Sequence, residues 1–200
     1  MIKFKEFVNA VVKNGFPKPS LEQYDGFVTK LHIGGVYTKM EAAMAVAQML
    51  WESSGFQNKK EWGCNKATGC PNKYDEPLSG CNVLGQQYYG RGYLKIRGCA
   101  EYLAASRELY GNEMLAQDPE IVARNETVAW ETSFWYWRQY VHSKPGLPVG
   151  LFGVTTRAIN GDLECYGPLQ EFARMRFEIY KVVRRAFGYY SEPDERGCYS

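Results

Sequence analysis

The sequence predicts a mainly α-helical fold with a small β-rich insertion that divides the molecule into two lobes. Apolar residues recur at helical spacing before residue 53 and again after residue 98. Between these parts, residues 55–98 are rich in Gly, Pro, Asn and Cys and lack helical periodicity. With 200 residues, of which 45% are hydrophobic, the chain can bury one sizeable core. We therefore expect residues 1–200 to form a single domain, with the β-rich lobe at roughly 55–98.

The individual helices follow from apolar periodicity and from capping residues. Ser20 and Thr38 each precede such a pattern and predict helix starts, because their hydroxyl oxygens can accept a backbone N–H. Gly34 and Gly35 predict the end of the second helix. The predicted helices cover residues 3–13, 20–31, 38–52, 100–110, 120–140 with a break near Asn125, 151–159 and 168–187.

The insertion is predicted to be braced by disulfides. Residues 88–89 and 93–96 are its strand-like runs. The chain has six cysteines without Cys-x-x-Cys spacing and only two histidines, which favours disulfides over a zinc site. Disulfides indicate an oxidising compartment, so we expect a secreted protein. Residues 1–16 predict an amphipathic helix, so we expect that a signal peptide is absent from this sequence.

Charge and composition narrow the class of partner. The 24 Lys and Arg nearly balance the 22 Asp and Glu, which argues against nucleic acid or an anionic membrane as the partner. No apolar stretch is long enough to predict a transmembrane helix. Aromatic residues reach 15%, and their flat faces can stack on sugar rings, although those in residues 130–137 are expected to pack in the core. These features favour a neutral substrate, and we expect a monomer.

Glu52 is the first candidate for chemistry because it ends the most apolar helical run. Residues 42–50 carry a single polar side chain, so this helix is predicted to be buried nearly all round. Ser53, Ser54 and Gly55 then end the helix and place the carboxyl at its buried mouth. A poorly solvated carboxyl favours its protonated form, which a general acid needs. The pattern is equally compatible with an exposed helix end.

Glu61 is the candidate for a second carboxylate. Cleavage of a glycosidic bond uses one protonated carboxyl and one ionised carboxylate, roughly 6.5–9.5 Å apart in inverting enzymes. Glu61 lies in a KKEWG segment, where two lysines favour its ionised form, and a loop can carry it back toward Glu52. Asp75 and Glu76 compete for this role, and Glu61 is also compatible with a solvated charge cluster.

Several segments together resemble glycoside hydrolase family 19, the inverting chitinases of lysozyme-like fold. The WESSGF segment is similar to the family's His-Glu-Thr segment, with Glu52 at the general acid and Trp51 in place of the histidine. Glu61 falls where compact members of the family place the general base. The run YYGRG at 88–92 is the most specific match, and RAINGDLEC at 157–165 resembles a further family segment.

The resemblance implies an activity and several site residues. The implied activity is endo-acting hydrolysis of β-1,4 linkages in chitin or N-acetylglucosamine oligomers, with inversion and without a cofactor or metal. Tyr88 and Asn160 are carried over as substrate-binding residues, and Arg176 as a site arginine whose expected partner is Glu61. The resemblance also implies that Cys165 pairs with a late cysteine, Cys198, while the pairing of the other four cysteines stays open.

Three positions depart from the family pattern. Lys95 replaces a sugar-binding Gln, Arg97 replaces a water-orienting hydroxyl, and Glu101 replaces Asn. If a strand continues here, these three side chains alternate onto one face and can form an ion-paired set beside the substrate.

These departures keep two alternatives open. The first is a peptidoglycan-cleaving lysin, which related folds also support. The second is a chitin-binding protein with weakened or lost catalysis, because Lys95 and Arg97 are cations where the family has neutral groups.

Overall fold

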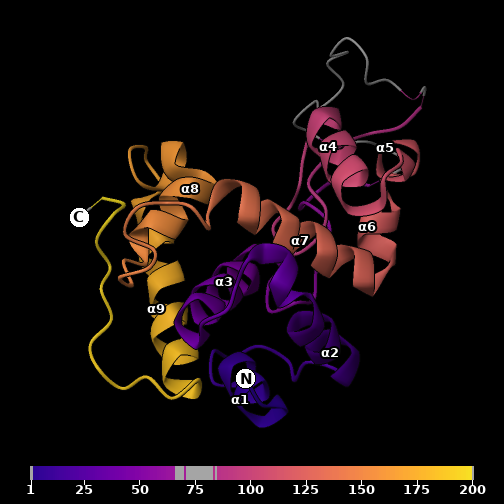
Figure 1. Cartoon of the computed structure of the whole chain (residues 1–200). Coiled ribbons are helices and arrows are strands. Elements are labelled where there is room, and N and C mark those ends of the chain that lie inside the picture. The colour runs from indigo at the N-terminus through magenta and orange to yellow at the C-terminus, as the bar shows by residue number, and fades with distance from the viewer. Residues whose placement is uncertain (1, 66–69, 71–82, 84, 200) are drawn as a thin grey trace.

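The computed structural model describes residues 2–65, 70, 83 and 85–199, and these residues are mainly helical (Figure 1). Its elements are α1 (Phe4–Val12), α2 (Leu21–Lys30), η1 (Leu31–Gly34), α3 (Lys39–Glu52), α4 (Cys99–Tyr110), α5 (Met114–Gln117), α6 (Ile121–Arg124), α7 (Glu126–Tyr140), α8 (Gly153–Glu164) and α9 (Gln170–Ala186). The predicted mainly α class is confirmed. The short helix α5 was not expected from the sequence.

The predicted caps account for where three helices begin. Ser20, Thr38 and Asn125 each use a side-chain oxygen to accept the backbone N–H three residues later, at 3.0, 3.1 and 3.1 Å. Asn125 is therefore the break between α6 and α7 that the sequence predicted. These bonds satisfy N–H groups that have no partner within the helix.

Helix α3 lies at the centre of the fold. Residues 41–50 are all buried, as the lack of a polar face predicts. Helix α9 packs along α3, and α1 packs along α9. Figure 1 shows α3 between these helices and α7. This packing fixes the end of α3, which carries Glu52, against the middle of α9.

Two hydrophobic clusters form the two lobes. The larger one joins α1, α2, α3 and α9 to one side of α7, and the smaller one joins α4, α5 and α6 to the other side. Helix α7 supplies both, because Trp130 belongs to the larger cluster and Trp135 to the smaller. Figure 1 shows α4, α5 and α6 grouped at one end of α7. The expected core packing of these aromatics is confirmed.

The β-rich character of the insertion is not confirmed. Within the described part of residues 55–98, no strand is present, and the isolated bridges include those between Lys60 and Arg91 and between Arg91 and Ile96. The strand expected at 93–96 is replaced by a turn at 92–95, and residues 88–89 have no regular secondary structure. Gly92 has a φ of 83° and Lys95 a φ of 54°, and both values are incompatible with an extended strand.

The described cysteines are in disulfides. Cys165 pairs with Cys198, as the resemblance implied, and this bond ties the C-terminal segment to the end of α8. Cys64 pairs with Cys70, and Cys99 is also disulfide-bonded. None of the helices in the described part of the chain is both long and apolar enough to span a bilayer.

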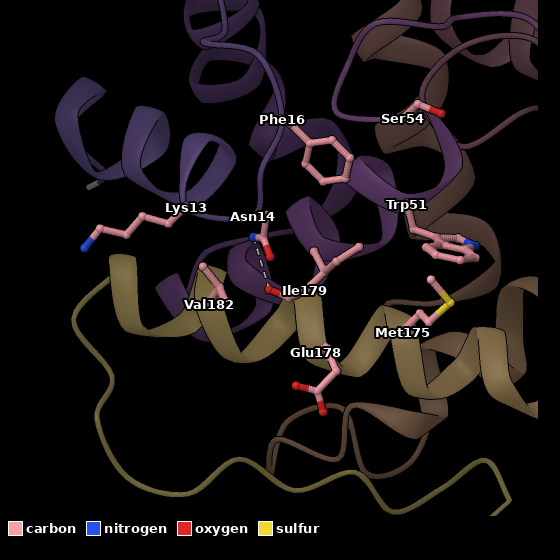
Figure 2. A pocket seen from close by; sticks show the side chains of 9 residues that line it. All are labelled: Lys13, Asn14, Phe16, Trp51, Ser54, Met175, Glu178, Ile179 and Val182. Atoms are coloured by element: carbon pink, nitrogen blue, oxygen red, sulfur yellow. Dashed lines mark hydrogen bonds between the residues drawn. The ribbon is translucent and has the colours of Figure 1, made fainter.

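A groove of about 780 Å³ lies where the end of α1, the end of α3 and helix α9 meet (Figure 2). Its lining is mostly apolar and includes Phe16, Trp51 and Ile179. It contains none of the side chains predicted to act in chemistry, although Trp51 directly precedes Glu52. The groove therefore lies beside the candidate site and is not part of it.

Candidate active site

Glu52 is the last residue of α3 and is held by a tight turn. Ser53 accepts the N–H of Phe56 at 2.9 Å and donates its hydroxyl to the carbonyl of Met49 at 2.5 Å. Three consecutive residues after Ser53 have positive φ, and a side chain at the central Gly55 would collide with Phe16 at 2.4 Å. The predicted end of the helix is confirmed, and the side chain of Glu52 is 17% exposed.

A buried arginine contacts Glu52 from the neighbouring helix. Arg176 on α9 is 1% exposed and donates from Nη2 to Glu52 Oε1 at 2.5 Å. The same guanidinium donates to both carboxylate oxygens of Glu164, at 2.6 and 2.7 Å, and to Gln48 at 2.7 Å. Burial alone would lower the pKa of Arg176, but Glu52 and Glu164 raise it.

This network corrects two predictions. Arg176 binds Glu52 and Glu164 instead of the expected partner Glu61, because α9 packs on α3 and not on the loop. The surroundings of Glu52 are also not simply apolar. Because Glu164 offers both oxygens to Arg176, Glu52 can take up a proton without leaving a buried cation unpaired.

Asn160 belongs to the same network. Its backbone departs from helical geometry within α8, and its side-chain amide donates to Glu164 Oε1 at 2.8 Å. Asn160 therefore connects, through Glu164 and Arg176, to Glu52. Glu164 and Gln48 are site residues that the sequence analysis missed. Glu164 lies within the RAINGDLEC segment, which was the available signal.

Glu61 is held by backbone contacts with the YYGRG segment. The N–H of Glu61 donates to the carbonyl of Gly90 at 2.7 Å, and the N–H of Gly90 donates to Glu61 Oε2 at 2.9 Å. The N–H of Gly92 donates to the carbonyl of Lys59 at 2.9 Å. These bonds attach the loop that carries Glu61 to the YYGRG segment. Asp75 and Glu76, the competing candidates, lie outside the described residues.

Two lysines fix the loop that carries Glu61 to the helices beside it. Lys59 pairs with Glu126 of α7, and Lys60 pairs with Glu120, which precedes α6, each at 2.7 Å. The sequence analysis assigned these lysines to the electrostatics of Glu61. In the structure their ammonium groups pair with Glu126 and Glu120 instead, and these pairs position the loop.

The YYGRG segment is mainly a structural support. Arg91 is 1% exposed and pairs with Glu120 at 2.6 Å, while Tyr89 donates its hydroxyl to the same carboxylate at 2.5 Å. Burial alone would raise the pKa of Glu120, but hydrogen bonds from Lys60, Tyr89 and Arg91 lower it to about 2. Tyr88 is 3% exposed and donates its hydroxyl to the Ala116 carbonyl at 2.7 Å, which argues against its predicted contact with substrate.

Lys95 is buried against the segment that carries Glu61. Its side chain is almost inaccessible, with the residue 6% exposed, and Nζ donates to the carbonyls of Asn58 and Gly92 at 2.6 and 3.1 Å. Burial lowers the pKa of Lys95 to about 8, although Glu52 and Glu61 both raise it. One buried ammonium therefore interacts with Glu52 and with Glu61.

The expected ion-paired set of Lys95, Arg97 and Glu101 does not form, because Lys95 lies apart from the other two residues. Lys95 turns inward to Asn58, whereas Arg97 is exposed and donates its backbone N–H to Glu101 Oε2 at 2.9 Å. Burial raises the pKa of Glu101, which also hydrogen-bonds with Tyr140. The alternation fails because the positive φ of Lys95 turns the chain.

One cluster of potential metal ligands occurs in the described part of the chain. It consists of Glu61, Cys64 and Cys70, whose ligand atoms lie within 4.8 Å of one another. Cys64 and Cys70 form a disulfide, so their sulfurs are not thiolates and do not suit a metal. The cluster instead places a disulfide beside the Glu61 carboxylate.

A helical fold built on two hydrophobic clusters, with one candidate carboxylate at a helix end and another on a loop, is in agreement with the lysozyme-like class. The comparisons with known proteins place the chain within that class. A family model described as chitinase class I matches residues 22–149. The chain belongs to glycoside hydrolase family 19.

Relatives and solved structures agree with this family. Endochitinase B from Zea mays is 37% identical over 172 residues, which are 84% of this chain and 56% of that protein. The chain therefore spans little more than half the length of this relative. Chitinase C from Streptomyces griseus gives a TM-score of 0.73 at 28% identity, covering 95% of this chain and 79% of that one. A class IV chitinase of the family from Zea mays gives 0.70 at 26%, covering 95% and 94%.

Proposed function

We propose that this chain is a secreted chitinase that hydrolyses β-1,4 linkages within N-acetylglucosamine polymers and acts as a single catalytic domain. Family membership and the names of the relatives support the reaction and the substrate. The observation that carries the proposal is a pair of positioned carboxylates: Glu52 at the end of a buried helix, bound by buried Arg176, and Glu61 on a loop, bound by the N–H of Gly90. The substrate is neutral, in agreement with the nearly balanced charge of the chain.

In this proposal Glu52 is the general acid and Glu61 activates water. Protonated Glu52 donates to the leaving glycosidic oxygen, while Arg176 stays neutralised by Glu164. Glu61 accepts a proton from the attacking water, and the backbone N–H of Gly90 holds its carboxylate in place. Direct displacement by water inverts the anomeric carbon. Trp62, which directly follows Glu61, is 91% exposed and offers an indole face on which a sugar ring can stack.

The test is hydrolysis of a defined N-acetylglucosamine oligomer with detection that resolves the product anomers. The wild-type protein should release α-anomers from β linkages. Glu52→Gln and Glu61→Gln should each lower the rate by about 10²- to 10⁴-fold, because a general acid or base contributes roughly this factor. The matched control is Glu113→Gln, since Glu113 is 50% exposed in a surface ion pair. Retention of the β configuration, or unchanged rates in both variants, would refute the assignment.

The same assay separates the remaining alternatives. A peptidoglycan-cleaving lysin would clear bacterial cell walls and leave the chitin oligomer intact. A binding protein would hold the oligomer without releasing product, and Arg97→Ser should then restore turnover. Arg97 is exposed in the structure, so this substitution is not expected to disturb the core.

A further inference from the structure

Lys95 occupies a position where the family pattern has a neutral amide, and its surroundings suggest a different use. An ammonium has three N–H donors, and two of them go to backbone carbonyls, those of Asn58 and Gly92. Asn58 begins the segment that carries Glu61. The side chain of Lys95 therefore binds the support of the proposed general base, with almost no surface left for a sugar.

The backbone around Lys95 allows its side chain to lie close to the segment that carries Glu61. A Cβ at Gly90 would lie 3.0 Å from Lys95 Cβ and 3.1 Å from Glu61 Oε2, so a larger residue there would push these two groups away from the Gly90 backbone. Lys95 itself has a φ of 54°, which is a strained value for a residue with a side chain. Such strain is retained where the surrounding structure holds the residue in place.

The charges that reach the Lys95 ammonium come from two elements. Helix α3 contributes Glu52 and the loop contributes Glu61. Helix α7 faces the same turn with Ser133, a neutral group that accepts the N–H of Tyr93 at 2.9 Å. A buried cation that interacts with two carboxylates stabilises negative charge on both and offsets their mutual repulsion.

We propose that Lys95 is a positioning residue that anchors the Glu61 loop through Asn58 and sets the pH range of activity through its charge on Glu52 and Glu61. The proposal rests on the proposed function for its effect on activity. Its electrostatic part concerns the protein alone and can be measured without substrate.

The first experiment measures the titration of Lys95 by NMR of lysine labelled at Cε and Nζ. The signal is assigned by its loss in Lys95→Met, with exposed Lys18→Met as the control. We expect a midpoint well below that of the other lysines. Because both carboxylates raise the pKa of Lys95, Glu52→Gln and Glu61→Gln should each lower the midpoint further. A midpoint that neither substitution moves would overturn the proposal, whether or not the protein hydrolyses chitin.

The second experiment compares pH–rate profiles of Lys95→Gln, Lys95→Met and Lys95→Arg. Removal of a positive charge disfavours the ionised form of nearby carboxylates, so the pH–rate profile should move to higher pH in the Gln and Met variants. Lys95→Arg retains the charge and should keep the wild-type position of the limbs. A rise in KM for Lys95→Gln with unmoved limbs would show a sugar contact and overturn the proposal. If the wild-type protein does not hydrolyse the oligomer, the proposed function is refuted. The role of Lys95 is then decided by the NMR titration alone.

Discussion

The two candidate carboxylates are held by different kinds of structure. Glu52 ends a buried helix and binds a fully buried arginine, which is itself bound by Glu164. Glu61 lies on a loop, where backbone bonds to Gly90 and two partly exposed lysine pairs hold it. Glu52, the proposed acid, is thus supported by buried charge that is balanced within the core. Glu61, the proposed base, is supported by several weaker contacts at the edge of the fold.

The two carboxylates should therefore respond differently to substitution of their partners. Removing one partner from a buried ion pair leaves an uncompensated charge, so substitutions around Glu52 should mainly lower the free energy of unfolding. Partly exposed pairs contribute little to stability because water can replace each partner. Substitutions around Glu61 should therefore mainly displace its loop and lower the rate of hydrolysis. Substitutions in each region test this contrast.

Arg176→Met should have the largest effect on stability. It leaves Glu52 and Glu164 facing each other in the core, and we expect a loss of about 3–5 kcal/mol in the free energy of unfolding. Urea unfolding measures it, with Arg185→Met on the exposed side of α9 as the control. Arg176→Lys should fall between them, because an ammonium cannot reproduce the forked contacts. A loss no greater than that of the control would show that the buried network is not what holds α9 to α3.

Glu120→Gln should have the next largest effect and should depend on pH. The folded-state pKa of Glu120 is about 2, below its ordinary value of 4.5, so its contribution is fully present above pH 4.5 and is lost as the pH falls toward 2. At pH 7 we expect a loss of about 3 kcal/mol, since one pKa unit corresponds to about 1.4 kcal/mol.

The measurement for Glu120 is unfolding of wild type and variant across pH 2–7. The difference between them should shrink below pH 4.5. The exposed Glu113→Gln is the control and should change stability by less than about 0.5 kcal/mol. A difference that is constant across this range would contradict the ionic role of Glu120 and assign it to packing.

The sequence was sufficient to place Glu52 at the end of a buried helix because the signals there are local. Thr38 caps α3, the run to Leu50 has no solvent face, and Ser53 with Gly55 ends the helix. Each of these signals depends only on residues that are close together in the sequence, so a single sequence is enough to predict the helix end. The helix break at Asn125 could be predicted for the same reason.

The partners of these residues could not be predicted, because they depend on packing between distant segments. Nothing near Arg176 in the sequence shows that α9 lies on α3, so its pairing with Glu52 instead of Glu61 appears only in the fold. Lys95 was expected on one face with Arg97 and Glu101, and a single positive φ reversed its direction. A residue pattern fixes periodicity but not the backbone turn that interrupts it.

The smallest effects are expected from the lysines of the Glu61 loop. Lys59→Met leaves Glu126 with hydrogen bonds from Tyr93 and Trp130, so unfolding should change by less than about 1 kcal/mol. Lys60→Met likewise leaves Glu120 bound by Arg91. The loop that carries the proposed base should nevertheless loosen, because both substitutions free its outer edge.

Kinetics of the single and double variants decide whether these two lysines position Glu61. Each single substitution should lower kcat by about threefold, and the double by more than the product of the two, because small displacements of a reacting group reduce rates steeply. If the loss of kcat in the double variant equals the product of the two single losses, the two pairs act independently and do not jointly hold the loop. A loss of stability in step with activity would also show that the loop does not depend on these pairs. Unchanged unfolding with a cooperative loss of kcat would confirm that the base is held for geometry and the acid for charge.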